Sequence, residues 1–253
     1  MAATVCGAPE RATYRRGVRI DVWSDLVCPF CHVGRRRLEL AVDEFLAGDP
    51  EREVEVTWHS YQLDRSAPAV VEGSNVDRIA EKYGRSREEM VAQHEAMAAD
   101  AAAVGLDFQW DKVVGGNSFD AHRVIHLARA RGLEKPVTDR VMRGWYTEGA
   151  ALGDTDTLVR LAVEGGLGEK DVRETLGSDA FGYDVREDEA TANQIGITAV
   201  PTFVLDQKFA VTGAQPVDGL VRALELTWED RGNAPEARGG GCGGCAGGCA
   251  CGA

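Results

Sequence analysis

The chain has 253 residues, of which 44% are hydrophobic and 27% are charged, and its formal net charge is -13. This length and apolar content allow a sizeable buried core, and the acidic surface opposes binding to the phosphate backbone of nucleic acids. No stretch approaches the roughly 20 consecutive apolar residues of a transmembrane helix, and the N-terminal segment lacks the apolar run of a signal peptide. We therefore expect a soluble cytoplasmic protein that binds neither nucleic acid nor membranes.

The first elements predicted along the chain form a βαβ unit. Residues 18–23 alternate apolar and polar side chains, which predicts a strand. Pro29 favours a helix start, and apolar residues at helical spacing extend this helix over 29–46, ahead of Gly48. Residues 54–58 alternate again and predict a second strand that runs parallel to the first.

The middle of the chain, from about residue 73 to 184, has helical periodicity without strand signals. Ser86 and Glu89 have the spacing of a capping box, which marks the start of one helix. The helices predicted in this block cover residues 86–104, 118–131, 136–148 and 155–164. We expect this block to be an all-helical insertion.

Strand signals return after the helical block. The predicted elements there are a helix over 187–195, strands over 202–205 and 209–211 that form a hairpin, and a helix over 217–228. The last helix has an apolar stripe that must pack on a partner, and the sheet is the candidate. The order of elements therefore predicts an α/β fold.

The cysteines are distributed unevenly. Cys6 stands alone near the N-terminus, and four cysteines lie in the glycine-rich segment 238–253. The body between them contains only Cys28 and Cys31. In a reducing compartment, closely spaced cysteines are more often catalytic, redox-sensing or metal-binding than structural.

The run Cys28-Pro29-Phe30-Cys31 has the spacing that two-step disulfide exchange requires. A thiol attacks as the thiolate, and a helix start favours that anion through its unpaired N–H groups and its dipole. Cys31, about one turn further along, can then attack the mixed disulfide and release the partner. A zinc site would need two more ligands; the adjacent His32 points away from the pair on a helix, and the body has no second matching pair. We therefore predict no metal, and a strand before the pair argues against two inert core thiols.

Val200 and Pro201 precede a predicted strand and form the candidate second half of the site. An X-Pro bond tolerates the cis form, but the sequence leaves the isomer open. A proline that only marks the start of a strand is the alternative.

Several motifs together resemble the DsbA family of thioredoxin-fold oxidoreductases, most of all its FrnE-like cytoplasmic branch. They are the run 25–34, Asn117 with Ala121-His122-Arg123, the run 196–201, and Gly213-Ala214-Gln215. The resemblance covers residues 18–230 and implies a thioredoxin-like fold with an all-helical insertion domain. The implied organisation is a discontinuous thioredoxin-like domain over 18–72 and 184–232, the insertion over 73–183, and a flexible tail over 233–253.

The resemblance also implies a role for each site residue. Cys28 would be an exposed nucleophile and Cys31 the resolving thiol, while Val200 and Pro201 face the cysteines and, with Pro29 and Phe30, contact the substrate. The implied activity is that of a protein disulfide oxidoreductase or isomerase without a cofactor, acting on disulfide- or thiol-containing proteins or small thiols, with glutathione a possible partner. DsbA has a histidine where Phe30 stands, so we predict a less oxidising pair here.

Two other functions stay open. The 2-hydroxychromene-2-carboxylate isomerases and kappa-class transferases use glutathione and resemble the chain in architecture, although they typically have serine in place of Cys28. The alternative outside the enzymes is a metal-binding or redox-sensing protein that acts through the tail cysteines Cys242, Cys245, Cys249 and Cys251. For that segment our hypothesis is a secondary redox or metal-capturing arm, and an inert low-complexity tail is the alternative.

Three weaker features have structural as well as functional interpretations. Asp25 could take part in proton transfer or cap a turn. His122 and His126 have the spacing of two metal ligands on a helix, but the glutamate of the His-Glu-x-x-His motif is absent. Arginines at 35–37 are expected to form a solvated helix face, and we assign them no role.

Overall fold

A computed structural model describes residues 17–71 and 73–233. In this part of the chain a mixed sheet has the strand order β2-β1-β3-β4, with β1 parallel to β2 and the other neighbours antiparallel. The strands are β1 (Val18–Ser24), β2 (Val54–Ser60), β3 (Thr202–Leu205) and β4 (Phe209–Thr212). Cys6 and the four tail cysteines, with the roles considered for them, lie outside the described residues.

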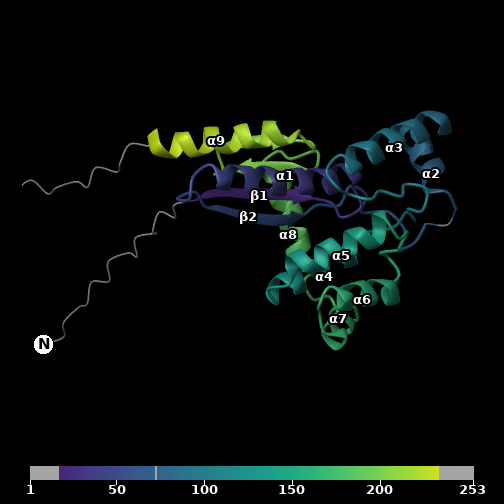
Figure 1. The fold of residues 1–253 in the computed structure, drawn as a ribbon. Coiled ribbons are helices and arrows are strands. Elements are labelled where there is room, and N and C mark those ends of the chain that lie inside the picture. The colour runs from purple at the N-terminus through teal and green to yellow at the C-terminus, as the bar shows by residue number, and fades with distance from the viewer. Residues whose placement is uncertain (1–16, 72, 234–253) are drawn as a thin grey trace, which may run out of the picture.

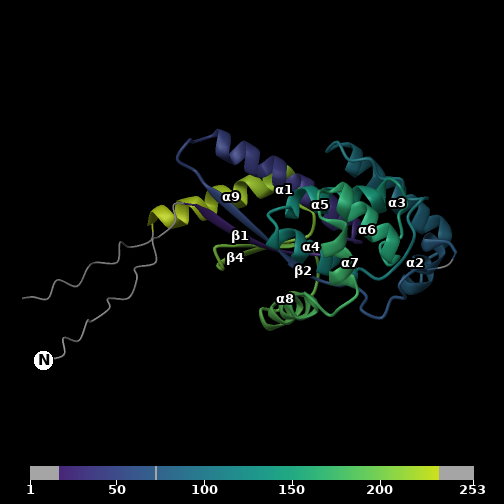
Figure 2. The ribbon, with the colours of Figure 1, turned by 90° about the horizontal axis from the view of Figure 1, so that it is seen from below.

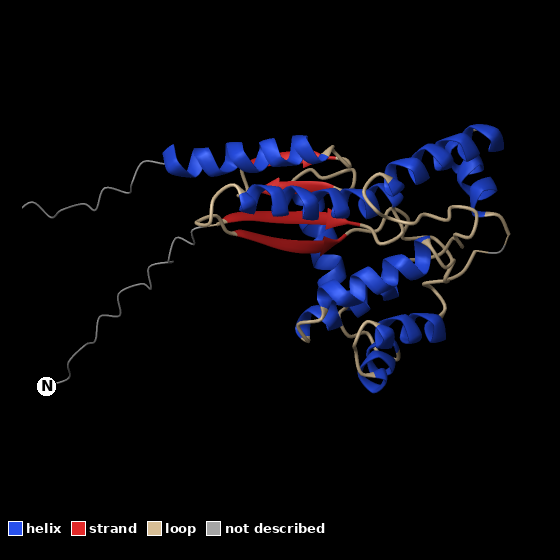
Figure 3. Ribbon diagram, in the orientation of Figure 1, coloured by secondary structure: helices blue, strands red, loops and turns tan. Residues whose placement is uncertain are grey.

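Helices cover both faces of the sheet. Helices α1 (Pro29–Ala47) and α9 (Val217–Asn233) lie together on one face, and α8 (Gly182–Gln194) lies on the other (Figures 1 and 3). The core under α1 and α9 consists of fully buried side chains from the sheet and both helices: Val18, Ile20, Val22, Leu38, Phe45, Phe203, Leu220 and Leu224. Burial of each such side chain contributes about 1.5–3 kcal/mol, which fixes α1 and therefore its N-terminal cysteines against the sheet.

The insertion between β2 and α8 contains six of the described helices. These are α2 (Asn75–Tyr83), α3 (Arg87–Ala102), α4 (Phe119–Ala130), α5 (Glu134–Tyr146), α6 (Thr155–Glu164) and α7 (Glu169–Leu176). In Figure 2, α2 and α3 lie at the far side of the helical block from α9. The core of this block includes Leu26 and Val33, so it packs directly on the turn and helix that carry Cys28 and Cys31.

The structure confirms an α/β thioredoxin-like fold with a helical insertion, and most predicted elements are present. Helices α2 and α7 were not predicted from the sequence. The signals for α2 were present, because Ser74 caps it by accepting a hydrogen bond from the Asp77 amide and Gly84 ends it with a φ of 62°. Helix α5 begins at Glu134, ahead of Pro136, and α8 begins at Gly182 after Phe181 in the left-handed region. The domain bounds predicted from the sequence stay a prediction.

The described residues also bear on membrane insertion. No helix among them is both long and apolar enough to cross a bilayer.

Candidate active site

Cys28 lies at the junction between β1 and α1. It is the N-cap residue of α1, with extended backbone angles (φ -91°, ψ 114°), and its side chain makes no capping hydrogen bond. Pro29 occupies the first helical turn, where its lack of an N–H group costs nothing. The thiol therefore lies at the positive end of the helix dipole and is not engaged as a cap.

Cys31 lies behind Cys28 and is fully buried. Its Sγ accepts a hydrogen bond from the Asp25 backbone N–H at 3.4 Å. Burial raises the pKa of Cys31 well above its ordinary value, and a hydrogen bond with Cys28 and the charge that Cys28 can carry raise it further. Hydrogen bonds from Ser24 and Asp25 act in the opposite direction but are weaker. Both thiols are free, and Cys31 is held as the protonated thiol.

Cys28 is less exposed than the sequence resemblance implied. Only 4% of the residue is accessible, because Trp23, Ile197 and Val200 pack around it in the same apolar cluster. The expectation of an exposed Cys28 is therefore wrong in this structure. The residue does line a surface groove, through which a reactant can reach it.

The loop that carries Val200 and Pro201 faces the cysteines, and the bond between these two residues is cis. The Cys28 Sγ lies 3.9 Å from the Val200 carbonyl oxygen. Gly34 on α1 permits this approach, because a Cβ at that position would lie 2.9 Å from the Pro201 Cγ. The Gly213 amide, which donates to the Pro201 carbonyl at 2.8 Å, fastens the loop to the segment that follows the hairpin.

The Asp25 carboxylate organises the turn that precedes Cys28. One oxygen accepts from the Leu63 amide at 2.8 Å, and the other accepts from the Val27 amide at 3.3 Å. The second oxygen also lies 3.4 Å from the His122 Nε2 in α4. Of the two roles considered from the sequence, these contacts are those of a cap, and they tie the cysteine turn to the insertion.

The cysteine groove is the cavity of about 380 Å³ that Cys28 lines. Its walls come from the start of α1, the segment after β2, and helices α2 and α3. Phe30, with 46% of its surface exposed, stands at this groove with Pro29. The volume is that of a site for a small molecule or a few residues of an extended peptide.

Comparison with known proteins matches residues 19–225 to the model of the DSBA-like thioredoxin domain. The chain belongs to this family. A probable DsbA oxidoreductase from Streptomyces coelicolor is 37% identical, with a TM-score of 0.79, over 85% of this chain and 91% of that one. The uncharacterized protein YwbO of Bacillus subtilis (strain 168) is 27% identical over 210 residues, 82% of this chain and 96% of its own length.

The cytosolic disulfide reductase DsbM from Pseudomonas aeruginosa, solved with GSH, shares the fold. It has a TM-score of 0.56 and 17% identity, over 83% of this chain and 99% of that one. The family predicted from the sequence is confirmed, and the protein is a member of a family of thiol-disulfide oxidoreductases. Its assignment to the FrnE-like branch stays a prediction.

Asn117 and Arg123, which belong to the motifs of the family resemblance, hold the segments around the groove in place. The Asn117 side chain accepts from the Gln62 side chain at 2.9 Å and donates to the carbonyl oxygens of Arg65 and Ala67. These contacts fix the segment after β2, which forms one wall of the groove of this DSBA-like protein. The buried Arg123 instead donates to carbonyls at the end of α7 and in the loop beyond it, and so holds the insertion together.

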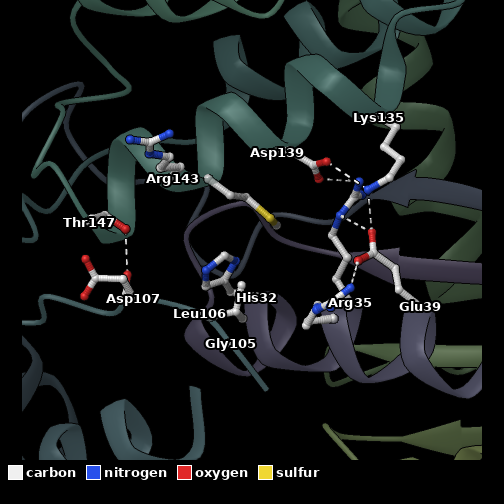
Figure 4. Close-up of a pocket in the computed structure, with 12 residues that line it drawn as sticks. His32, Arg35, Glu39, Gly105, Leu106, Asp107, Lys135, Asp139, Arg143 and Thr147 are labelled. Atoms are coloured by element: carbon white, nitrogen blue, oxygen red, sulfur yellow. Dashed lines mark hydrogen bonds and ion pairs between the residues drawn. The ribbon is translucent and has the colours of Figure 1, made fainter. Parts of the chain in front are cut away.

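A second cavity, of about 540 Å³, lies between α1 and α5 and contains neither cysteine (Figure 4). We call it the charged cavity, because Arg35, Glu39, Lys135 and Asp139 form an ionic network along its wall. Arg35 is only 6% exposed, and its guanidinium lies 3.0 Å from Asp139 and over the Trp58 ring. The solvated face predicted for residues 35–37 is therefore wrong at Arg35, because helix α5 covers it.

The two histidines with metal-ligand spacing have separate partners. His122 faces Asp25, whereas His126 contacts the Ser60 hydroxyl at 3.0 Å and the Asp188 carboxylate at 3.2 Å. Among the described residues, no group of three or more His, Cys, Asp or Glu side chains is arranged to hold a metal ion. Both histidines join elements of this DSBA-like fold to one another.

Several residues of the groove were not identified from the sequence. Arg78 and Lys82 come from α2, which was missed, and Met90 and His94 come from α3. The cap signals around α2 could have located that helix. No sequence signal reveals that α2 and α3 pack beside Cys28, because that contact joins segments far apart in the chain.

Proposed function

We propose that this protein carries out thiol-disulfide exchange, with Cys28 as the attacking sulfur and Cys31 as the resolving sulfur. The observation that carries the proposal is the position of Cys28, at the N-terminus of α1 and 3.9 Å from the Val200 carbonyl, with the protonated Cys31 thiol behind it. Both cysteines are buried, but only Cys28 is the N-cap residue of α1, where the helix N-terminus favours a thiolate. This difference assigns the two roles.

In the reductive direction, the Cys28 thiolate attacks one sulfur of the substrate disulfide and releases the other as a thiolate. Cys31 then loses its proton and attacks the Cys28 sulfur, which releases the second substrate sulfur. The substrate disulfide gains two electrons, and the cysteine pair loses two and becomes a disulfide. Oxidation of a dithiol substrate is the same sequence in reverse, so the site serves either direction.

We place the substrate between the Val200-Pro201 loop and the side chains of Pro29 and Phe30. The Val200 carbonyl beside the Cys28 sulfur offers a hydrogen-bond acceptor to an extended substrate backbone. The half-exposed Phe30 ring offers an apolar contact next to the same sulfur. The lack of a hydrogen-bond donor on Phe30 favours a pair that is less oxidising than that of DsbA.

The decisive experiment is an equilibrium redox titration of the Cys28 and Cys31 pair in glutathione buffers. Alkylation and proteolysis followed by mass measurement separate this pair from the tail cysteines. We expect a reversible two-electron transition, and its midpoint distinguishes a reductase from an isomerase or an oxidase. If the pair does not titrate, the proposal is wrong.

We propose glutathione as the second partner, because DsbM, a cytosolic disulfide reductase that shares the fold, was solved with GSH. A glutathione-dependent isomerase would leave a glutathione adduct on Cys28 alone and would keep its turnover after Cys31→Ser. Exchange by the cysteine pair requires both sulfurs. The cytoplasmic location is part of the proposal, in line with the location of DsbM.

A further inference from the structure

A small cavity lies behind the cysteine groove. Its volume is about 70 Å³, and its walls include Trp145 and Tyr146 at the end of α5. We call it the inner cavity. It shares Val27, Pro29 and Arg78 with the walls of the cysteine groove, so the two spaces adjoin beneath the start of α1.

Residues that line the inner cavity carry hydrogen-bond donors that have no partner within the described part of the chain. Among the described residues, six buried side-chain nitrogen or oxygen atoms lack a hydrogen bond, and three of them are Arg78 Nε, Trp145 Nε1 and the Tyr146 hydroxyl. Tyr146 and Trp145 are only 1% and 3% exposed. Buried polar groups are normally paired, so three such atoms around one cavity indicate a group that binds there.

The chemistry of these atoms selects an acceptor. The indole and guanidinium nitrogens can only donate hydrogen bonds, and burial raises the pKa of Tyr146 well above its ordinary value, so the phenol keeps its proton. His94 also lines the inner cavity, and its Nδ1 donates to the Met90 carbonyl at 2.8 Å. A carboxylate accepts only, and it matches three donors better than water does.

Charge around the cysteine groove also favours an anion. Arg78, Lys82 and Arg85 line the groove, and the first two share the single carboxylate of Asp64, at 4.0 and 3.1 Å. The side chain of Arg85 donates to the neutral amide of Gln93. The groove thus has three cations against the carboxylates of Asp64 and the buried Asp25, on a chain whose net charge is -13, and this local excess of positive charge would draw acidic molecules toward Cys28.

The inner cavity is close to the sulfur chemistry. Val27 and Pro29, the two neighbours of Cys28 in the chain, line both the inner cavity and the cysteine groove. Cys28 is 4% exposed, which suits a slender reactant better than a folded protein surface.

We propose that the inner cavity binds a carboxylate of a small acidic disulfide whose sulfur reaches Cys28 through the cysteine groove. The inference rests on the exchange reaction proposed above and names its substrate class. Cys28 attacks the disulfide and releases one acidic thiolate, and Cys31 then releases the other. The substrate gains two electrons and the cysteine pair loses two.

The test uses the reduced full-length protein in single-turnover reactions with two probes. Glutathione disulfide carries carboxylates, and bis(2-hydroxyethyl) disulfide carries none. The rate of oxidation of the Cys28 and Cys31 pair is read by acid quench, alkylation and mass, and is normalised to the reaction of each probe with free dithiothreitol. We expect wild type to prefer glutathione disulfide, and Tyr146→Phe or Trp145→Phe to lower this preference about tenfold or more, as loss of a hydrogen bond to a charged group would.

Thr138→Val is the matched control. Thr138 is on the same helix as Tyr146, and its buried hydroxyl also lacks a partner in residues 17–71 and 73–233, but it does not line the inner cavity. This control should keep the wild-type preference. Tyr146→Phe removes no hydrogen bond within the described residues, and it keeps the ring that stacks on His32 at 4.4 Å, so the variant should fold.

The other outcomes distinguish failure of the carboxylate site from failure of the exchange reaction. If wild type shows no preference, or if Tyr146→Phe changes it no more than Thr138→Val does, the carboxylate site is wrong while exchange itself stands. A protein disulfide that oxidises the pair faster than glutathione disulfide would also overturn the small acidic substrate. If neither probe oxidises the pair, the exchange reaction proposed above is what fails.

Discussion

Two cavities flank the start of α1. Both are lined by charged side chains, but the charges are paired differently in each. In the charged cavity, Arg35 and Lys135 lie against the carboxylates of Glu39 and Asp139 (Figure 4). In the cysteine groove, three cations stand against the carboxylates of Asp25 and Asp64, and the Arg85 side chain donates to the neutral amide of Gln93. The first arrangement holds α1 to α5, whereas the second leaves positive charge available to a reactant beside Cys28.

The largest effect expected concerns the two cysteines, because Cys28 lines the groove and does not line the charged cavity. We expect Cys28→Ser and Cys31→Ser each to lower disulfide turnover by at least about a thousandfold, because each exchange needs both sulfurs. The two variants should differ in what accumulates. Proteolysis and mass measurement after addition of a disulfide should show a stable mixed disulfide on Cys28 in the Cys31→Ser variant and none on Cys31 in Cys28→Ser. Turnover that survives Cys28→Ser would contradict the assigned roles.

The next effect concerns pH and the charged cavity. Burial, with the nearby charge of Arg35, lowers the pKa of His32 from 6.5 to about 4. Between these values the unfolded chain binds more protons than the folded one, so stability falls as the pH falls from about 6.5 to about 4. The loss is up to roughly 3 kcal/mol at the low end.

His32→Phe tests this expectation, because it removes the titration and keeps a ring against Tyr146. Urea unfolding at several pH values should show that the variant loses less stability than wild type below pH 6.5. Above pH 7 the difference between the two proteins should be constant. Parallel curves over the whole range would show that His32 is not the group involved.

A smaller effect is expected at the contact between α1 and the Val200-Pro201 loop. A Cβ at Gly34 would lie 2.9 Å from the Pro201 Cγ, so Gly34→Ala must displace the loop. We expect a loss of stability of about 2 kcal/mol and slower exchange. Gly219→Ala in α9 is the control, because its Cβ would meet no atom nearer than 3.9 Å, and it should be neutral or slightly stabilising. Equal stability of the two variants would contradict the tight contact.

The smallest effect is expected for Asp139→Ala in the charged cavity, and it tests whether this cavity influences exchange in the cysteine groove. Asp139→Ala leaves the buried Arg35 with Glu39 as its remaining carboxylate at 3.9 Å, and we expect a loss of about 1 kcal/mol in the free energy of unfolding. The exchange rate should not change, because the charged cavity contains no sulfur of the pair. Asp156→Ala, which removes an exposed ion pair with Arg173, should cost less. Slower exchange in Asp139→Ala would show that the cavities act together.

Much of the candidate site could be predicted from the sequence, because its chemistry is local. The strand before Cys28, the proline at the start of α1 and the two-residue spacing to Cys31 all act within one turn of the chain. The proline at 201 was identified beside its strand for the same reason. These local signals predicted the elements around the cysteines and the family.

Tertiary structure decided the features that depend on contacts between distant segments. It placed α2 and α3 beside Cys28, covered that cysteine with Trp23 and Ile197, and brought Tyr146 beneath the same turn. It also buried Arg35 against Asp139, although the pattern of α1 favoured solvent there. Burial and charge pairing arise from packing across the whole chain, and for that reason the short-range pattern of the sequence determined the sulfur site while only the fold determined what surrounds it.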